Sequence, residues 1–197
     1  MNKIARITSP NRLSVEEYLA FIAPRPSEER WQLIDGIAIL MNPSTLRHQS
    51  VGRNLLIELQ LHYRAEGLPF SALYEVGLIV PDVDKFRPEC DVAVVDEAVD
   101  LDANYADRFF LVAEIRSDSN TDAEIDLKRV RYMQHPDNLY CLVISQTEVK
   151  VELWARAGGW QRTELTRLDQ AIELPAFGCA IGLAALYRGT GVGEVRI

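Results

Sequence analysis

The stretch LVAEIRSDSNTDAEIDLKRVRY, residues 111–132, contains an apolar strand with an acid near its end, then a short polar loop and a helix. The run FFLVAEI, residues 109–115, is typical of a buried strand. Phe110, Val112 and Glu114 alternate onto one face of such a strand. Because an unpaired charge among apolar side chains is costly, Glu114 is expected to have a partner.

The helix of this stretch is predicted from about Thr121 to Gln134. Its apolar residues Ala123, Leu127 and Val130 are expected to line one face of the helix. The residues Glu124, Lys128 and Tyr132 lie four apart and form a neighbouring ridge. One interpretation is a surface ion pair between Glu124 and Lys128, worth about 0.2–0.5 kcal/mol. The other is that the ridge borders a cleft at the end of the strand that carries Glu114.

A second strand-borne acid lies upstream of this stretch. Asp91 precedes the apolar run VAVV, residues 92–95. Two carboxylates on neighbouring strands can converge on one hard cation such as Mg²⁺. A cation held in this way can activate water and stabilise charge on a phosphodiester. The structural alternative is that Glu114 pairs with Arg116 or with another base.

The rest of the chain alternates helix and strand signals. Ser14 and Glu17 form a capping box, and Asp35-Gly36 between two apolar runs predicts a hairpin. Further elements are predicted as a helix over 46–64, strands over 70–80, 90–95, 139–145 and 149–155, a hairpin at 158–159, and a short strand and helical turn over 171–187. We expect an α/β (α+β) fold with a mixed central sheet flanked by helices and additional antiparallel hairpins. Without repeats or a long linker, residues 1–197 are expected to form a single domain, with 1–12 as a short N-terminal arm.

Composition limits the classes of protein that fit. The chain is 48% hydrophobic and 25% charged, has no apolar run long enough for a membrane helix, and starts without the apolar segment of a secretory signal. Three scattered cysteines argue against a disulfide framework and favour the reducing cytoplasm. The net charge of −8 argues against tight DNA binding but allows a local basic cleft.

Taken in order, the motifs resemble a large, mostly bacterial family of restriction-endonuclease-like proteins in the PD-(D/E)xK superfamily. The positions that fall at the spacing of the family are Glu114, Ser117, Ser119, Glu124, Lys128 and Tyr132. Upstream, the turn at Leu33 to Gly36, with Pro43 and His48, is similar to the opening hairpin and helix of the family. The strand around Asp91 resembles its Pro-Asp strand, and 139–145 and 149–154 resemble its closing strands.

The resemblance implies an endonuclease that hydrolyses nucleic-acid phosphodiester bonds. Asp91 and Glu114 would hold Mg²⁺, with Mn²⁺ as an alternative ion, and Lys128 would assist catalysis. The residues that would line the site are Gln32, His48, Arg116, Glu124 and Tyr132. The implied partner is nucleic acid, with weakly bound DNA expected, and two cuts on a duplex would suit a homodimer.

Departures from the family pattern leave a second hypothesis open. Gln32 stands where the family has Glu, and Glu89-Cys90 separates Pro88 from Asp91. Arg116 stands where the superfamily often has its Lys. These changes fit a non-catalytic binding or assembly protein that retains the nuclease fold. A third hypothesis, a zinc hydrolase, finds little support because the three histidines, His48, His62 and His135, show no ligand spacing.

Overall fold

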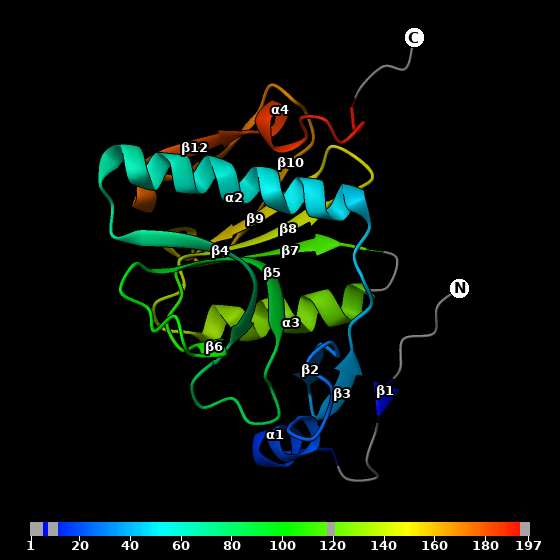
Figure 1. Ribbon diagram of the computed structural model, residues 1–197. Coiled ribbons are helices and arrows are strands. Elements are labelled where there is room, and N and C mark those ends of the chain that lie inside the picture. The colour runs from blue at the N-terminus through cyan, green and yellow to red at the C-terminus, as the bar shows by residue number, and fades with distance from the viewer. Residues whose placement is uncertain (1–5, 8–11, 118–120, 194–197) are drawn as a thin grey trace.

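The computed structural model describes residues 6–7, 12–117 and 121–193, and its centre is a seven-stranded mixed sheet (Figure 1). The strand order is β10-β9-β8-β7-β5-β4-β6. These strands are β4 (Phe70–Leu78), β5 (Glu89–Asp96), β6 (Tyr105–Ala106), β7 (Leu111–Arg116), β8 (Tyr140–Ser145), β9 (Val151–Ala155) and β10 (Arg162–Leu165). The β4–β6 and β7–β8 pairs are parallel and the other neighbours are antiparallel. The expected mixed sheet with flanking helices is confirmed.

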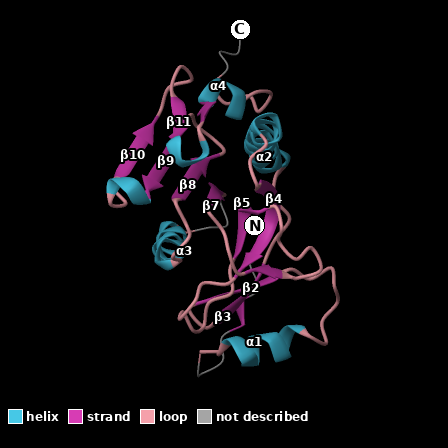
Figure 2. Cartoon of the chain, turned by 90° about the vertical axis from the view of Figure 1, so that its left-hand side faces the viewer, coloured by secondary structure: helices cyan, strands magenta, loops and turns pink. Residues whose placement is uncertain are grey.

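Two helices cover opposite faces of this sheet (Figure 2). On one face, α2 (Leu46–Glu66), predicted as a helix over 46–64, buries Val51, Leu55, Leu59 and Tyr63. The same core includes the hairpin of β11 (Ala171–Leu174) and β12 (Cys179–Gly182), and α4 (Leu183–Leu186). On the other face, α3 (Asp122–Gln134) packs against a second core. Short 3-10 turns lie at Arg156–Gly158 and Pro175–Phe177.

A smaller three-stranded sheet lies beside the main one. It consists of β1 (Arg6–Ile7), β3 (Ile37–Leu40) and β2 (Trp31–Ile34), with α1 (Val15–Ile22) packed on it. The hairpin turn has φ of 49° at Asp35 and 77° at Gly36, the left-handed geometry that joins tightly paired strands. A Cβ at Gly36 would lie 2.4 Å from Cβ of Arg12, so the turn requires glycine. The predicted hairpin is confirmed, as is the capping box before α1.

Helix α3 begins and ends where the sequence predicted, but it buries a different face. Thr121 caps it in a capping box with Glu124. The buried residues are Ile125, Lys128 and Tyr132, whereas Val130 is 48% exposed and Ala123 is exposed. Of the predicted apolar stripe, Leu127 packs partly against this core, whereas the prediction is wrong for Ala123 and Val130. Lys128 and Tyr132 are buried because their polar ends reach Glu114.

Several details were not predicted from the sequence. The two-residue strands β1 and β6 pair with β3 and β4. Phe110 lies just before β7 and packs in the core under α2. Of the two apolar residues expected on the face of Glu114, Phe110 and Val112, only Val112 lies there. Cys90 and Cys141 are buried free cysteines. None of the helices in the described ranges is both long and apolar enough to span a membrane.

Candidate active site

Asp91 and Glu114 are neighbours across two adjacent strands. The antiparallel register of β5 and β7 pairs Val92 with Ala113, so Asp91 and Glu114 are the next residues on the two strands. Residues that lie opposite each other on neighbouring strands share one face of a sheet. Both side chains line a single pocket, so the structure brings the two predicted acids together.

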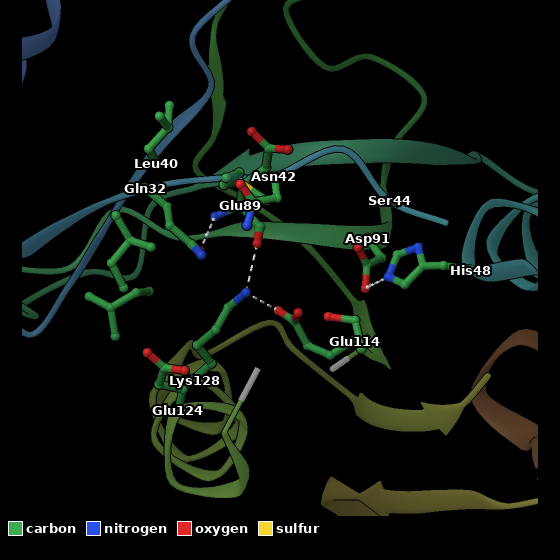
Figure 3. Close-up of a pocket in the computed structure, with 14 residues that line it drawn as sticks. Gln32, Leu40, Asn42, Ser44, His48, Glu89, Asp91, Glu114, Glu124 and Lys128 are labelled. Atoms are coloured by element: carbon green, nitrogen blue, oxygen red, sulfur yellow. Dashed lines mark hydrogen bonds and ion pairs between the residues drawn. The ribbon is translucent and has the colours of Figure 1, made fainter. Parts of the chain in front are cut away.

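The pocket lies where β5, β7, α3 and the start of α2 meet the small sheet (Figure 3). Its volume is about 70 Å³, room for a cation and a few waters. The residues that line it are Gln32, Ile34, Ile39, Leu40, Met41, Asn42, Ser44, His48, Glu89, Asp91, Glu114, Ser117, Glu124 and Lys128. Of the eight predicted site residues, all but Arg116 and Tyr132 lie on this lining. Ser119 and Asn120 are outside the described residues.

Glu114 is a buried acid with two donors on one oxygen. The residue is 7% exposed, and its Oε1 lies 2.6 Å from Nζ of Lys128. The hydroxyl of Tyr132 donates to the same oxygen at 2.7 Å. Burial raises the pKa of Glu114, the charge of Lys128 opposes this rise, and the charge of Asp91 adds to it, with a net upward shift. The expected partner of Glu114 is thus confirmed, and burial rather than Asp91 is the main cause of its raised pKa.

Lys128 belongs to the interior of the site. It is 3% exposed and donates to the backbone oxygen of Glu89 at 2.7 Å in addition to its ion pair with Glu114. Glu124 uses its Oε2 to accept the backbone N–H of Thr121 at 3.0 Å. The interpretation of Lys128 as a surface residue is therefore wrong, because its charge is directed into the pocket.

Asp91 is also held through one oxygen. Its Oδ2 accepts the backbone N–H of Ile115 at 2.6 Å and lies 3.4 Å from Nε2 of His48. His48 is 4% exposed and occupies the first turn of α2, where Thr45 caps the helix by accepting the His48 backbone N–H at 3.2 Å. Burial lowers the pKa of His48, but the hydrogen bond and charge of Asp91, together with the Ile115 backbone and the charge of Glu114, outweigh burial and raise it overall. The imidazole of His48 is therefore more readily protonated, which places a positive charge next to Asp91.

Gln32 reaches the pocket because β2 is tied to the strand region before β5. Leu33 and Arg87 exchange backbone hydrogen bonds of 2.9 Å in each direction. The neighbouring Gln32 is 7% exposed and its Oε1 accepts the backbone N–H of Glu89 at 3.4 Å. A carboxamide, not a carboxylate, thus occupies this wall of the pocket.

Glu89 also lines the pocket, although it is not among the site residues predicted from the sequence. It lies two residues before Asp91 on β5, a spacing typical of one side of a strand, and both residues line the pocket. Its carboxylate pairs with Arg30, which also lies 2.6 Å from Glu75. The spacing from Asp91 was the available signal.

Arg116 was predicted either to pair with Glu114 or to line the site, and it does neither. Its guanidinium pairs with Asp122 and lies 3.4 Å from Glu152, so it is not the partner of Glu114. The other histidines are equally remote from the site: His62 contacts the backbone oxygen of Phe177 and His135 that of Asp107. Within the described ranges, no three His, Cys, Asp or Glu side chains come together as a metal cluster.

The donor set nevertheless fits one magnesium ion. Mg²⁺ is usually held by one or two protein carboxylates, with water or phosphate completing its shell. Among the described residues, Oδ1 of Asp91 and Oε2 of Glu114 have no hydrogen-bond partner, while the other oxygen of each carboxylate is anchored. The pocket therefore offers two hard oxygen atoms on adjacent strands.

The mixed sheet and its flanking helices place the chain in the restriction-endonuclease-like class of fold. One solved structure with this fold is "a putative nuclease belonging to DUF820 from Anabaena variabilis ATCC 29413". It is 14% identical, has a TM-score of 0.73, and the match covers 89% of this chain and 97% of that chain. Residues 15–185 match the Uma2 family, described as "Putative restriction endonuclease", and the chain belongs to this family. No curated protein matches the chain.

Proposed function

We propose that this protein is a metal-dependent endonuclease that hydrolyses phosphodiester bonds in nucleic acid. The observation that carries the proposal is the pairing of Asp91 and Glu114 across β5 and β7, beside the buried ammonium of Lys128. Membership of the Uma2 family and the nuclease-like fold support the same conclusion.

Asp91 and Glu114 would hold the cation, Mg²⁺ or Mn²⁺, through the carboxylate oxygens that are not hydrogen-bonded within the described residues. When bound, such a cation lowers the pKa of water and stabilises charge on the phosphate. The protein supplies the rest of the electrostatics. The pocket lining contains four acids against one lysine and one histidine, so its charge favours a divalent cation.

Lys128 supplies a fixed positive charge next to the reacting phosphate. Its ammonium has three N–H donors, of which one points to Glu114 and one to the backbone oxygen of Glu89. The third has no partner among the residues that the structure describes and would serve a water or a phosphate oxygen in the pocket. Because the ammonium is already held, it can stabilise charge that develops on the phosphate without rearranging.

The partner is nucleic acid, and DNA bound weakly is the form we expect. The net charge of −8 and the acidic pocket lining oppose strong non-specific attachment to phosphates. Two catalytic centres related by a twofold axis would cut both strands of a duplex, which favours a homodimer. The unpaired cysteines fit a cytoplasmic location.

A non-catalytic binding or assembly role is the second candidate. The observation that favours it is Gln32, which places an uncharged carboxamide in the pocket at the position where the family pattern implies a carboxylate. Loss of one acid would weaken the hold on a cation while leaving the fold intact.

A cleavage assay separates the two candidates. The purified protein is incubated with supercoiled plasmid and with single-stranded DNA and RNA, in Mg²⁺, in Mn²⁺ and in EDTA. The nuclease proposal predicts divalent-dependent cleavage that is lost in Asp91→Asn and in Glu114→Gln. Cleavage that persists in both variants would refute the assigned site. If the parent is inactive in every ion but Gln32→Glu cleaves, the non-catalytic role is supported.

A further inference from the structure

Glu114 is anchored asymmetrically. Lys128 and Tyr132 both contact its Oε1, at 2.6 and 2.7 Å. Its Oε2 has no hydrogen bond from any residue of the described segments. The terminal torsion of a glutamate is broad, so a carboxylate turns easily unless it is held. Two donors on one oxygen remove this freedom and leave the second oxygen in a defined place.

Tyr132 acts from outside the pocket. It is 1% exposed and is absent from the pocket lining, so it cannot touch a substrate or a cation there. Its ring is fixed between Phe86 and Phe109, with centroid distances of 6.0 and 6.3 Å. The hydroxyl is therefore delivered to Glu114 by a rigid side chain, and any influence on the pocket passes through Glu114.

Asp91 is anchored by the same principle from a different part of the fold. Its Oδ2 accepts the Ile115 backbone N–H at 2.6 Å and lies 3.4 Å from His48. Each of the two carboxylates thus has one oxygen tied to the protein and one without a partner among the described residues. Satisfying the buried charge of Glu114 alone would not require Asp91 to be anchored in the same way.

We propose that Tyr132 is a positioning residue whose hydroxyl, together with Lys128, orients Glu114 so that Oε2 faces the cation in the pocket. The inference rests on the proposed function, because it assumes that the pocket holds a divalent cation. The rival explanation is structural: the hydroxyl merely satisfies a buried carboxylate. The two differ in their effect on metal affinity, since groups that orient metal ligands typically contribute 10–100-fold.

The test replaces one hydroxyl and uses a matched control. Tyr132→Phe removes the donor and keeps the aromatic ring. Tyr63→Phe is the control, because Tyr63 is also 1% exposed and its hydroxyl has no hydrogen-bond partner among the described residues. Mn²⁺ affinity is measured by electron paramagnetic resonance and by calorimetry at a temperature where circular dichroism shows each variant to be folded.

We expect Tyr132→Phe to weaken Mn²⁺ binding by about 10–100-fold and Tyr63→Phe to leave it unchanged. The rise in melting temperature on addition of Mn²⁺ should shrink only in Tyr132→Phe, because ligand stabilisation follows mass action. If the parent binds Mn²⁺ and Tyr132→Phe binds it within twofold, the positioning role is overturned while the metal site stands. If the parent binds no divalent ion, or Glu114→Gln binds as well as the parent, the proposed site itself fails and the inference fails with it.

Discussion

Replacement of Lys128 by methionine removes a buried ammonium and keeps most of the side-chain volume. The ammonium lies 2.6 Å from Glu114 Oε1 and both residues are buried, at 3% and 7% exposure. Removing one partner of a buried ion pair typically costs about 3–5 kcal/mol. We therefore expect the free energy of unfolding to fall by about 3–5 kcal/mol at neutral pH. For a chain of this length that corresponds to a fall in melting temperature of roughly 6–20 °C.

The loss of stability in Lys128→Met should be smaller at acidic pH than at neutral pH. Burial is the largest cause of the raised pKa of Glu114 and Lys128 opposes the rise, so Lys128→Met should raise that pKa further above 4.5. Between 4.5 and the folded-state pKa, the folded variant binds more protons than the unfolded chain, so its stability falls as pH rises. Below this window the carboxyl is neutral in both states, and the deficit relative to the parent should shrink.

Urea unfolding at about pH 7 and at about pH 4 measures both effects, with the double variant Lys128→Met/Glu114→Gln as the control. Because the double variant carries no unpaired charge, it should regain most of the stability that Lys128→Met loses. The reasoning is refuted if Lys128→Met costs less than about 1 kcal/mol at neutral pH, where a surface pair would be expected to contribute only about 0.2–0.5 kcal/mol. A deficit that is the same at both pH values, or a double variant as unstable as the sum of the two single ones, would also contradict it.

Three further outcomes follow from the structure. Gln32→Glu adds a carboxylate to the pocket and should tighten Mn²⁺ binding in calorimetry; unchanged affinity would mean that this wall does not reach the cation. Gly52→Ala should destabilise the protein by about 1–3 kcal/mol in urea unfolding, because the new Cβ would lie 2.4 Å from Cε2 of Tyr74; full stability would show that α2 can shift freely. Duplex DNA binding, followed by fluorescence anisotropy, should be weak and should decline as salt rises, and salt-independent binding would argue against phosphate contacts.

The elements with strong local signals were predictable. The capping box at Ser14 and the Asp35-Gly36 turn are short patterns whose physics is contained in a few neighbouring residues, and both occur as predicted. The buried period of α2 was equally clear, because its apolar residues Val51, Leu55, Leu59 and Tyr63 pack at regular spacing on a sheet. Local chemistry was sufficient in each of these cases.

The face of α3 was not predictable from apolar periodicity. Apolar periodicity identifies a buried face only where the buried residues are apolar. In α3, Val130 is 48% exposed while Lys128 is buried. The reason is long-range: Glu114 on β7 draws Lys128 and Tyr132 inward. The family resemblance did identify Lys128 and Tyr132 as site candidates, because the family pattern includes their spacing from Glu114. The apolar pattern contains no such information.

Short pairings were missed for a different reason. Two residues are too few to show a period, so β6 gave no strand signal. Its pairing with β4 depends on Gly77, where a Cβ would lie 2.7 Å from the ring of Tyr105. The contact from Lys128 to the backbone oxygen of Glu89 likewise joins distant segments and leaves no local pattern.

The most direct test of the central claim is a crystal structure of the protein with Mn²⁺, using anomalous scattering at the manganese edge. Our account predicts one strong anomalous peak in the pocket, in contact with both Asp91 and Glu114, and no such peak in crystals of Glu114→Gln grown in the same way. A parent crystal without a peak at these two carboxylates, or with a peak that survives in Glu114→Gln, would contradict the claim that they hold the catalytic cation.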